Sequence, residues 1–183
     1  MGIYQDKREK TKKEIITAFW NVYERSESLR DVNIKNITQE AGIHRGTFYI
    51  HFEDVNALVR EVEMQLLDSF EILNIKNDAF FEEERLEKCI KYMYENRRYY
   101  TILLSEKGDA NFKTKLIQKF ILIICPSYYE EKLSKEMSFR IEFIAGGMMN
   151  ATLYCLLNET ILEKEMIKLF YRFFNEIKNS ILL

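Results

Sequence analysis

The fold is decided by one stretch of the chain, residues 33–58, which reads NIKNITQEAGIHRGTFYIHFEDVNAL. Its first part places apolar residues at helical spacing: Ile34, Ile37 and Ala41. Asn33 stands in front of them as a helix N-cap, because its side-chain oxygen can accept an unpaired backbone N–H. Gly42 follows where a helix ends in left-handed backbone, a conformation that glycine adopts easily. The pattern predicts a short helix closed by a glycine turn.

A second short helix is predicted from about Arg45 to His51, with Phe48 and Phe52 pointing inward. Two short helices joined by a glycine-containing turn form a helix-turn-helix unit, whose second helix enters the major groove of DNA. The candidates for DNA contact are the residues facing away from the two phenylalanines, Arg45, Gly46, Thr47, Tyr49 and His51. Arginine can read guanine through two hydrogen bonds, whereas tyrosine and histidine suit phosphate contacts.

The net charge of the whole chain gives no sign of DNA binding, but the local charge near its start does. The 183 residues carry a net charge of -2, yet residues 6–13 hold five Lys or Arg against two Asp or Glu. This basic arm is locally +3, and phosphate neutralisation supplies most of the affinity for DNA. We expect phosphate contacts from Lys12 and Lys13 of the arm and from Lys35 at the start of the first short helix.

The rest of the chain predicts an all-α fold of about nine helices. A single proline argues against an all-β sandwich, which needs many turns. Outside the helix-turn-helix unit, helices are predicted at about residues 7–24, 54–70, 79–96, 99–107, 109–125, 135–157 and 160–179. Asp54 and Asp109 are predicted N-caps, and Pro126 is predicted to end the helix before it.

Composition narrows the class of protein further. No segment resembles a signal peptide or a membrane span, and Cys89, Cys125 and Cys155 are too widely spaced for a zinc site, so we expect free thiols in a reduced, cytoplasmic protein. No catalytic or nucleotide-binding motif is present, and the prediction is a protein that is not an enzyme and needs no cofactor or metal.

Several short motifs resemble those of the TetR family of transcriptional regulators. They are Ala41-Gly42-Ile43, the run from Arg45 to Tyr49, His51-Phe52 and Ala57-Leu58. A looser resemblance, to a C-terminal domain common in such regulators of Gram-positive bacteria, covers residues 103–109 and 143–147. The resemblance implies a helix-turn-helix DNA-binding domain at residues 1–54 and a helical ligand-binding and dimerisation domain at residues 55–183.

What the resemblance implies for function is a homodimer that binds a palindromic operator on double-stranded DNA. The expected mechanism is that of a repressor released when a small apolar or aromatic effector changes the spacing of the two reading helices. Two other hypotheses stay open. One is a DNA-binding dimer controlled by a protein partner without a small ligand, and the other is a helical carrier or enzyme that has lost DNA binding.

Three positions depart from the pattern of the family. His44 stands where members carry Ser, Thr or Asn, and histidine is a poorer N-cap. Val55 stands where members carry a lysine that binds phosphate, so we expect one phosphate contact fewer and a smaller salt dependence. Residues 25–32 lack the usual glycine.

The C-terminal half supplies candidate residues for the effector and for the dimer. Aromatic residues and methionines are abundant there, and a cavity for the effector is predicted among Met93, Tyr94, Phe120, Phe143, Met148 and Tyr154. The last two helices are apolar over more than one face, which indicates cover by a second copy in a four-helix bundle, or else a place at the centre of a monomer. The predicted dimer residues are Ile144, Met148, Leu162, Phe170, Phe173 and Phe174.

Overall fold

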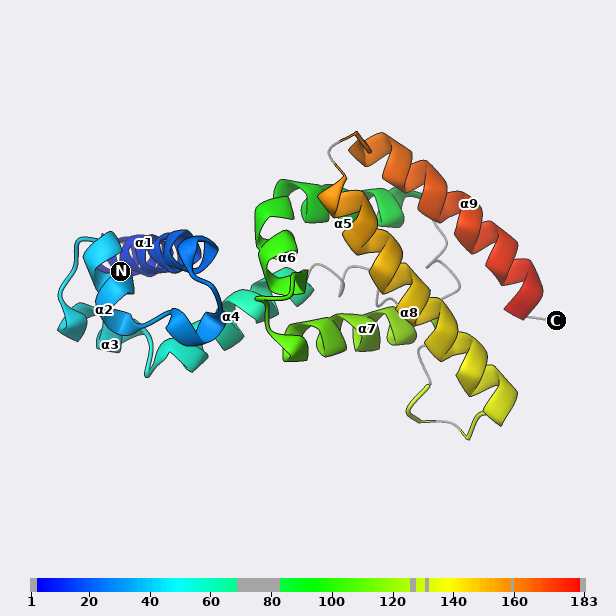
Figure 1. Cartoon of the computed structure of the whole chain (residues 1–183), viewed down its shortest axis with the longest axis horizontal. Coiled ribbons are helices and arrows are strands. Elements are labelled where there is room, and N and C mark those ends of the chain that lie inside the picture. The colour runs from blue at the N-terminus through cyan, green and yellow to red at the C-terminus, as the bar shows by residue number, and fades with distance from the viewer. Residues whose placement is uncertain (1–2, 69–82, 126–127, 131, 159, 182–183) are drawn as a thin grey trace. The chain divides into compact units, whose positions relative to one another are not determined.

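The computed structural model describes residues 3–68, 83–125, 128–130, 132–158 and 160–181, and in this part of the chain the regular elements are all helices joined by turns and short connections. Figure 1 shows the helices in chain order. They are α1 (Ile3–Arg25), α2 (Ile34–Glu40), α3 (Arg45–His51), α4 (Val55–Asp68), α5 (Glu83–Glu95), α6 (Arg97–Leu104), α7 (Ala110–Ile124), α8 (Lys135–Leu157) and α9 (Glu163–Ile181), with a 3-10 turn η1 (Leu29–Asp31) after α1. The all-α prediction is confirmed.

The chain divides into two compact units. The first holds Met1–Gln65 together with Ser105–Asp109, and the second holds Leu66–Leu104 and Ala110–Leu183. The first unit therefore extends past residue 54 into α4, where Leu58 and Val62 are buried.

The core of the first unit is built by one face of α1 and the short helices. The buried face of α1 includes Ile15, Phe19 and Tyr23, and the rings of Phe19 and Trp20 are in edge-to-face contact at 5.1 Å between centroids. Ile37 of α2 and Phe48 of α3 are fully buried, and α2 packs on both α1 and α3. Burial of such side chains contributes about 1.5–3 kcal/mol each, which fixes the short helices on α1.

The helix boundaries predicted for the helix-turn-helix unit agree with the structure. The side chain of Asn33 accepts the backbone N–H of Asn36 at 3.1 Å. Gly42 has φ of 65°, the left-handed conformation that ends α2. His44 makes no side-chain capping hydrogen bond at the start of α3, as expected for a poor N-cap. Asp54 caps α4 by accepting the N–H of Ala57 at 2.7 Å.

The second unit is a helical cluster in which α8 packs on α6 and α7, and α9 packs on α5. Its buried side chains include Tyr100, Phe112, Leu116, Ile141 and Met148. The Tyr100 hydroxyl, buried with its ring, donates to the carbonyl of Leu66 at 2.6 Å, so its polar group is satisfied inside the core.

Some predicted boundaries differ from the structure. The connection after α1 contains the 3-10 turn η1, in which Asp31 accepts the Ser28 N–H at 3.0 Å and its hydroxyl at 2.8 Å. Helix α9 begins at Glu163, three residues later than predicted. The predicted end of the helix at residue 70 and the predicted start of the next helix at residue 79 lie outside the described residues. Pro126, which was predicted to end the helix before it, also lies outside them.

Candidate DNA-binding interface

Helix α3 turns one face to the core and the other to solvent. Phe48 is 0% exposed, and Phe52, just past the helix, is also buried. The predicted contact residues Arg45, Gly46 and Tyr49 are exposed, and Thr47 and His51 are half-buried. The structure therefore brings these five predicted residues together on one short helix whose far side is anchored.

One exposed residue of α3 was missed by the sequence prediction. Ile50 is 65% exposed, although it is one of the most hydrophobic side chains of the helix. The helical phase could have found it, since it lies half a turn away from the buried Phe48. An apolar side chain on the outer face of a DNA-reading helix can contact a thymine methyl group.

The three predicted lysines lie in different environments. Lys12 is half-buried, and its ammonium group is 2.7 Å from the Glu61 carboxylate and 5.9 Å from the centre of the Phe52 ring. The hydrogen bond from Lys12 lowers the pKa of Glu61. Lys12 therefore ties α1 to α4, whereas Lys13 and Lys35 are exposed.

His51 lies in a setting that disfavours its charged form. Partial burial is the main cause that lowers the pKa of His51, and the positive charges of Arg8 and Lys12 lower this pKa further. The histidine is therefore neutral at physiological pH in the absence of DNA. A phosphate beside it would reverse this bias, because an opposite charge favours the protonated ring.

The start of α4 carries no cation. Its first residue, Val55, is half-buried, and the first turn of α4 is capped by the carboxylate of Asp54. Glu53 beside it is exposed. This end of α4 therefore has no lysine or arginine side chain for a phosphate, and the loss of one phosphate contact stays a prediction.

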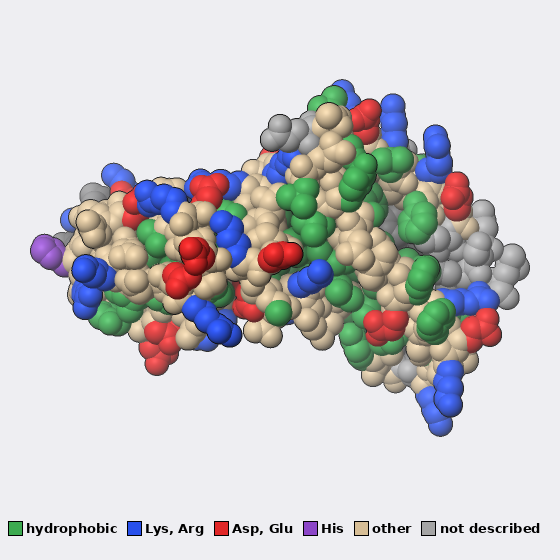
Figure 2. All heavy atoms as spheres, viewed as in Figure 1, with side chains coloured by type: hydrophobic (Ala, Val, Ile, Leu, Met, Phe, Trp, Pro, Cys, Tyr) green, Lys and Arg blue, Asp and Glu red, His purple; other side chains and the backbone are tan. Residues whose placement is uncertain are grey.

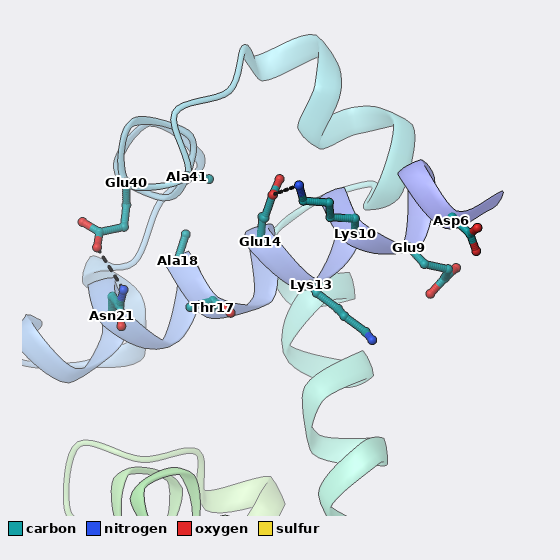
Figure 3. A pocket seen from close by; sticks show the side chains of 10 residues that line it. All are labelled: Asp6, Glu9, Lys10, Lys13, Glu14, Thr17, Ala18, Asn21, Glu40 and Ala41. Atoms are coloured by element: carbon teal, nitrogen blue, oxygen red, sulfur yellow. Dashed lines mark hydrogen bonds and ion pairs between the residues drawn. The ribbon is translucent and has the colours of Figure 1, made fainter. Parts of the chain in front are cut away.

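An open hollow of about 690 Å³ lies between α1 and α2. Figure 3 shows its lining, with Lys10 reaching toward Glu14, at 4.0 Å, and Lys13 extending away from that pair. Four carboxylates and two ammonium groups line it: Asp6, Glu9, Glu14, Glu40, Lys10 and Lys13. The acidic excess makes the hollow itself a poor match for the phosphates of DNA, whereas the Lys13 side chain extends away from Lys10 and Glu14 and leaves its ammonium group for such a contact.

The predicted effector residues do not gather at one place in the second unit. Met93, Phe120 and Met148 are buried. Tyr94 is half-buried, and its hydroxyl donates to the Ile161 carbonyl at 2.9 Å. Phe143 and Tyr154 instead lie on the surface of α8, where Phe143 is 72% exposed. They differ from the prediction because α8 is apolar on two faces and only one packs on α6 and α7.

The predicted dimer residues divide in the same way. Met148 and Phe170 are buried within the protomer, Ile144 is half-buried, and Leu162 and Phe173 are exposed. The side chain of Phe174 lies outside the described residues. Further exposed apolar residues were missed by the prediction: Phe139, Leu157 and Leu169.

These side chains form an exposed apolar surface on α8 and α9. We define the α8–α9 surface by its exposed members: Phe139, Phe143, Tyr154, Leu157, Leu162, Leu169 and Phe173. Figure 2 shows hydrophobic side chains gathered over these two helices. The rings of Phe139 and Phe143 stack one turn apart with centroids at 6.2 Å. A large exposed apolar patch marks an interaction site.

Within the described residues, the structure offers no metal site and no membrane-spanning helix. No group of three or more His, Cys, Asp or Glu could hold a metal ion there. None of the described helices is long and apolar enough to cross a membrane. Burial raises the pKa of the Cys89 thiol to about 12 and also raises that of Cys155, which keeps both as inert thiols.

The comparison with protein families identifies the class of this protein. Residues 83–176, more than half of the chain, match the TetR-type family described as transcriptional regulator C-terminal region. The chain belongs to the TetR family of transcriptional regulators. No curated protein matches the sequence significantly.

Solved structures share the fold. A TetR transcriptional regulator from Streptococcus agalactiae 2603V has a TM-score of 0.67 and 21% identity, covering 93% of this chain and 97% of that chain. The dihydroxyacetone kinase operon activator DhaS has a TM-score of 0.62 and 22% identity over 92% and 96%. A regulator of the TerR/AcrR family from Aquifex aeolicus VF5 has a TM-score of 0.61 and 17% identity over 91% and 99%.

Proposed function

We propose that this TetR-family regulator binds a palindromic DNA operator as a homodimer in the cytoplasm and leaves it when a small effector binds. Residues 1–54 are the proposed DNA-binding domain and residues 55–183 the regulatory domain. The observation that carries the proposal is the outer face of α3, where Arg45, Gly46 and Tyr49 are exposed above the buried Phe48.

The chemistry of this face supports DNA as the partner. Arg45 stands at the first position of α3, and N-terminal residues of such a helix reach base edges in the major groove. Lys13 of α1 and Lys35 of α2 are exposed cations that can contact phosphates of DNA. Lys12 acts mainly by holding α1 on α4, because its charge is matched by Glu61 at 2.7 Å.

The α8–α9 surface supports a second copy of this chain as the dimer partner. A two-fold dimer places the same patch of each copy against the other, which suits an apolar surface carried by two neighbouring helices. Exposed members such as Phe143 and Leu162 then become buried, and four helices pack together. Met148 and Phe170 support this surface from within each protomer.

The proposed effector is apolar or aromatic and enters the core of the second unit, to which Met93, Phe120 and Met148 contribute buried side chains. Methionine side chains adapt to ligands of irregular shape, which supports this location. An effector releases DNA only if it binds more tightly to the dimer geometry that does not fit the operator.

Activation of transcription is the second candidate outcome of DNA binding. It is favoured by one observation, that a structure of the same fold is named an operon activator. The DNA-binding and dimer surfaces proposed here serve either outcome, since a bound dimer can block or recruit polymerase.

A gel-shift titration with the DNA upstream of the chain's own gene tests the proposal. We expect a specific complex at low salt that resists unlabelled competitor DNA of unrelated sequence and weakens as salt rises. Absence of any specific complex at low salt would refute DNA regulation. Mass spectrometry of small molecules that co-purify with the protein tests the effector.

A further inference from the structure

Ile50 occupies the most outward position of α3. With ~100° of rotation per residue, it lies ~200° around the helix from the buried Phe48. Gly46, one turn earlier, lies on the same outer face. Ile50 is 65% exposed, and a Cβ added at Gly46 would meet no atom within 4 Å. The protein itself leaves the space in front of both residues open.

The direction of the side chain places Ile50 over the turn that carries Gly46. Helical side chains lean toward the N-terminus of their helix and cover the preceding turn. Because Gly46 has no side chain, it places no atoms between Ile50 and a surface that docks on α3. The backbone of α3 at Gly46 and the side chain of Ile50 can therefore approach the same surface.

We propose that Ile50 is a specificity-determining residue that contacts the C5-methyl group of a thymine in the operator. The inference rests on the proposed function, in which α3 lies in the major groove. The edges of the base pairs in that groove present donors and acceptors, and thymine alone adds an apolar group. Isoleucine has no hydrogen-bonding group, so it gains from the thymine methyl and desolvates the polar edges of other bases.

Replacement of thymine by uracil tests this contact, since it removes only the methyl group. Full-length protein first selects duplexes from a randomised library, and each thymine of the selected operator is then replaced singly by uracil. Fluorescence anisotropy gives the affinity. We expect one position in each half-site where uracil weakens binding about fourfold, the effect of losing one buried methyl group.

The Ile50→Ala variant completes the test, and Met64→Ala is its matched control. Both residues are exposed and apolar in the first unit, but Met64 lies on α4. We expect I50A to bind thymine and uracil operators equally and M64A to keep the fourfold preference. If I50A discriminates as well as the natural chain, or if no thymine is sensitive, Ile50 does not read a methyl group although DNA binding stands. If no specific duplex is selected at all, the proposed function fails and the inference with it.

Discussion

At the scale of single residues, the outer face of α3 combines side chains of different chemistry on a buried anchor. Phe48 fixes the helix, Arg45 and Tyr49 supply hydrogen bonds, and Ile50 supplies an apolar surface. The apolar spacing of residues 33–58 predicted that Phe48 is buried and that the polar residues of α3 face outward, because buried residues recur with the period of a helix. Ile50 could not be assigned by hydrophobicity alone, since an apolar residue is ordinarily expected to face the core.

Arg45→Ala is expected to weaken binding to the operator by about 1–3 kcal/mol and to relax selection at one base pair. The reason is the loss of two hydrogen bonds to a guanine. Arg30→Ala is the control, because Arg30 is an exposed arginine outside α3. Affinity measured on operators mutated at each position checks the result, and an equal loss on every DNA sequence would make Arg45 a phosphate contact instead.

The affinity for DNA is expected to rise as the pH falls from about 8 to about 6. Without DNA the pKa of His51 is lowered by burial and by Arg8 and Lys12. A bound phosphate raises it, so binding takes up a proton, and the gain is at most about tenfold per pH unit for each protomer.

His51→Gln tests this dependence, with His44→Gln as the control, because these two are the only histidines of the chain. The H51Q variant should lose the pH dependence and H44Q should keep it. The same pH profile in H51Q and the natural chain would exclude a phosphate contact by the charged ring.

At the scale of elements, the end of α1 is held by a segment far away in sequence. The Tyr23 hydroxyl donates to the carbonyl of Lys107 at 3.0 Å, and the Lys107 ammonium group donates to the carbonyl of Glu24 at 2.9 Å. A cation at a helix C-terminus satisfies carbonyl groups that have no partner within the helix. The segment Ser105–Asp109 therefore stabilises α1, which carries the basic arm.

Lys107→Met is expected to lower the free energy of unfolding by about 0.5–1.5 kcal/mol. The methionine keeps the aliphatic stem but removes the charge and the hydrogen bond to Glu24. Urea unfolding measures the change, and Lys113→Met, at an exposed position of α7, is the control. Equal stability of K107M and K113M would show that the contact contributes nothing.

Helix boundaries could be predicted from the sequence where they depend on local contacts. The bounds of α3 and α8 agree with the prediction, because caps and helical period mark them within a few residues. What covers an apolar helix face could not be predicted from the sequence. Hydrophobicity indicates that Phe143 is covered, but not whether an effector, the core or a second chain covers it.

At the scale of the whole molecule, the two compact units carry different proposed tasks. The first unit holds the basic arm and α3, and the second holds the α8–α9 surface. The net charge of -2 therefore says little about DNA binding, which depends on the local charge and on two copies acting together.

Phe143→Glu is expected to convert the dimer into folded monomers, because it would bury a charge in the proposed interface. Phe143 is exposed in the protomer, so the variant should keep its fold. Phe170 is a poorer choice, since it is buried and a charge there would disrupt the protomer itself. Sedimentation velocity checks the result with Met64→Glu on α4 as the control, and a stable F143E dimer would place the interface elsewhere.

The proposed function requires two copies of this chain to bind one DNA operator through their α3 helices. Native mass spectrometry of the full-length protein mixed with its selected duplex tests it most directly, because mass gives the composition of the complex. We expect two chains on one duplex, and a smaller fraction of that species when Arg45→Ala replaces the natural chain. A specific complex with one chain per duplex, or no complex at low salt, would contradict it.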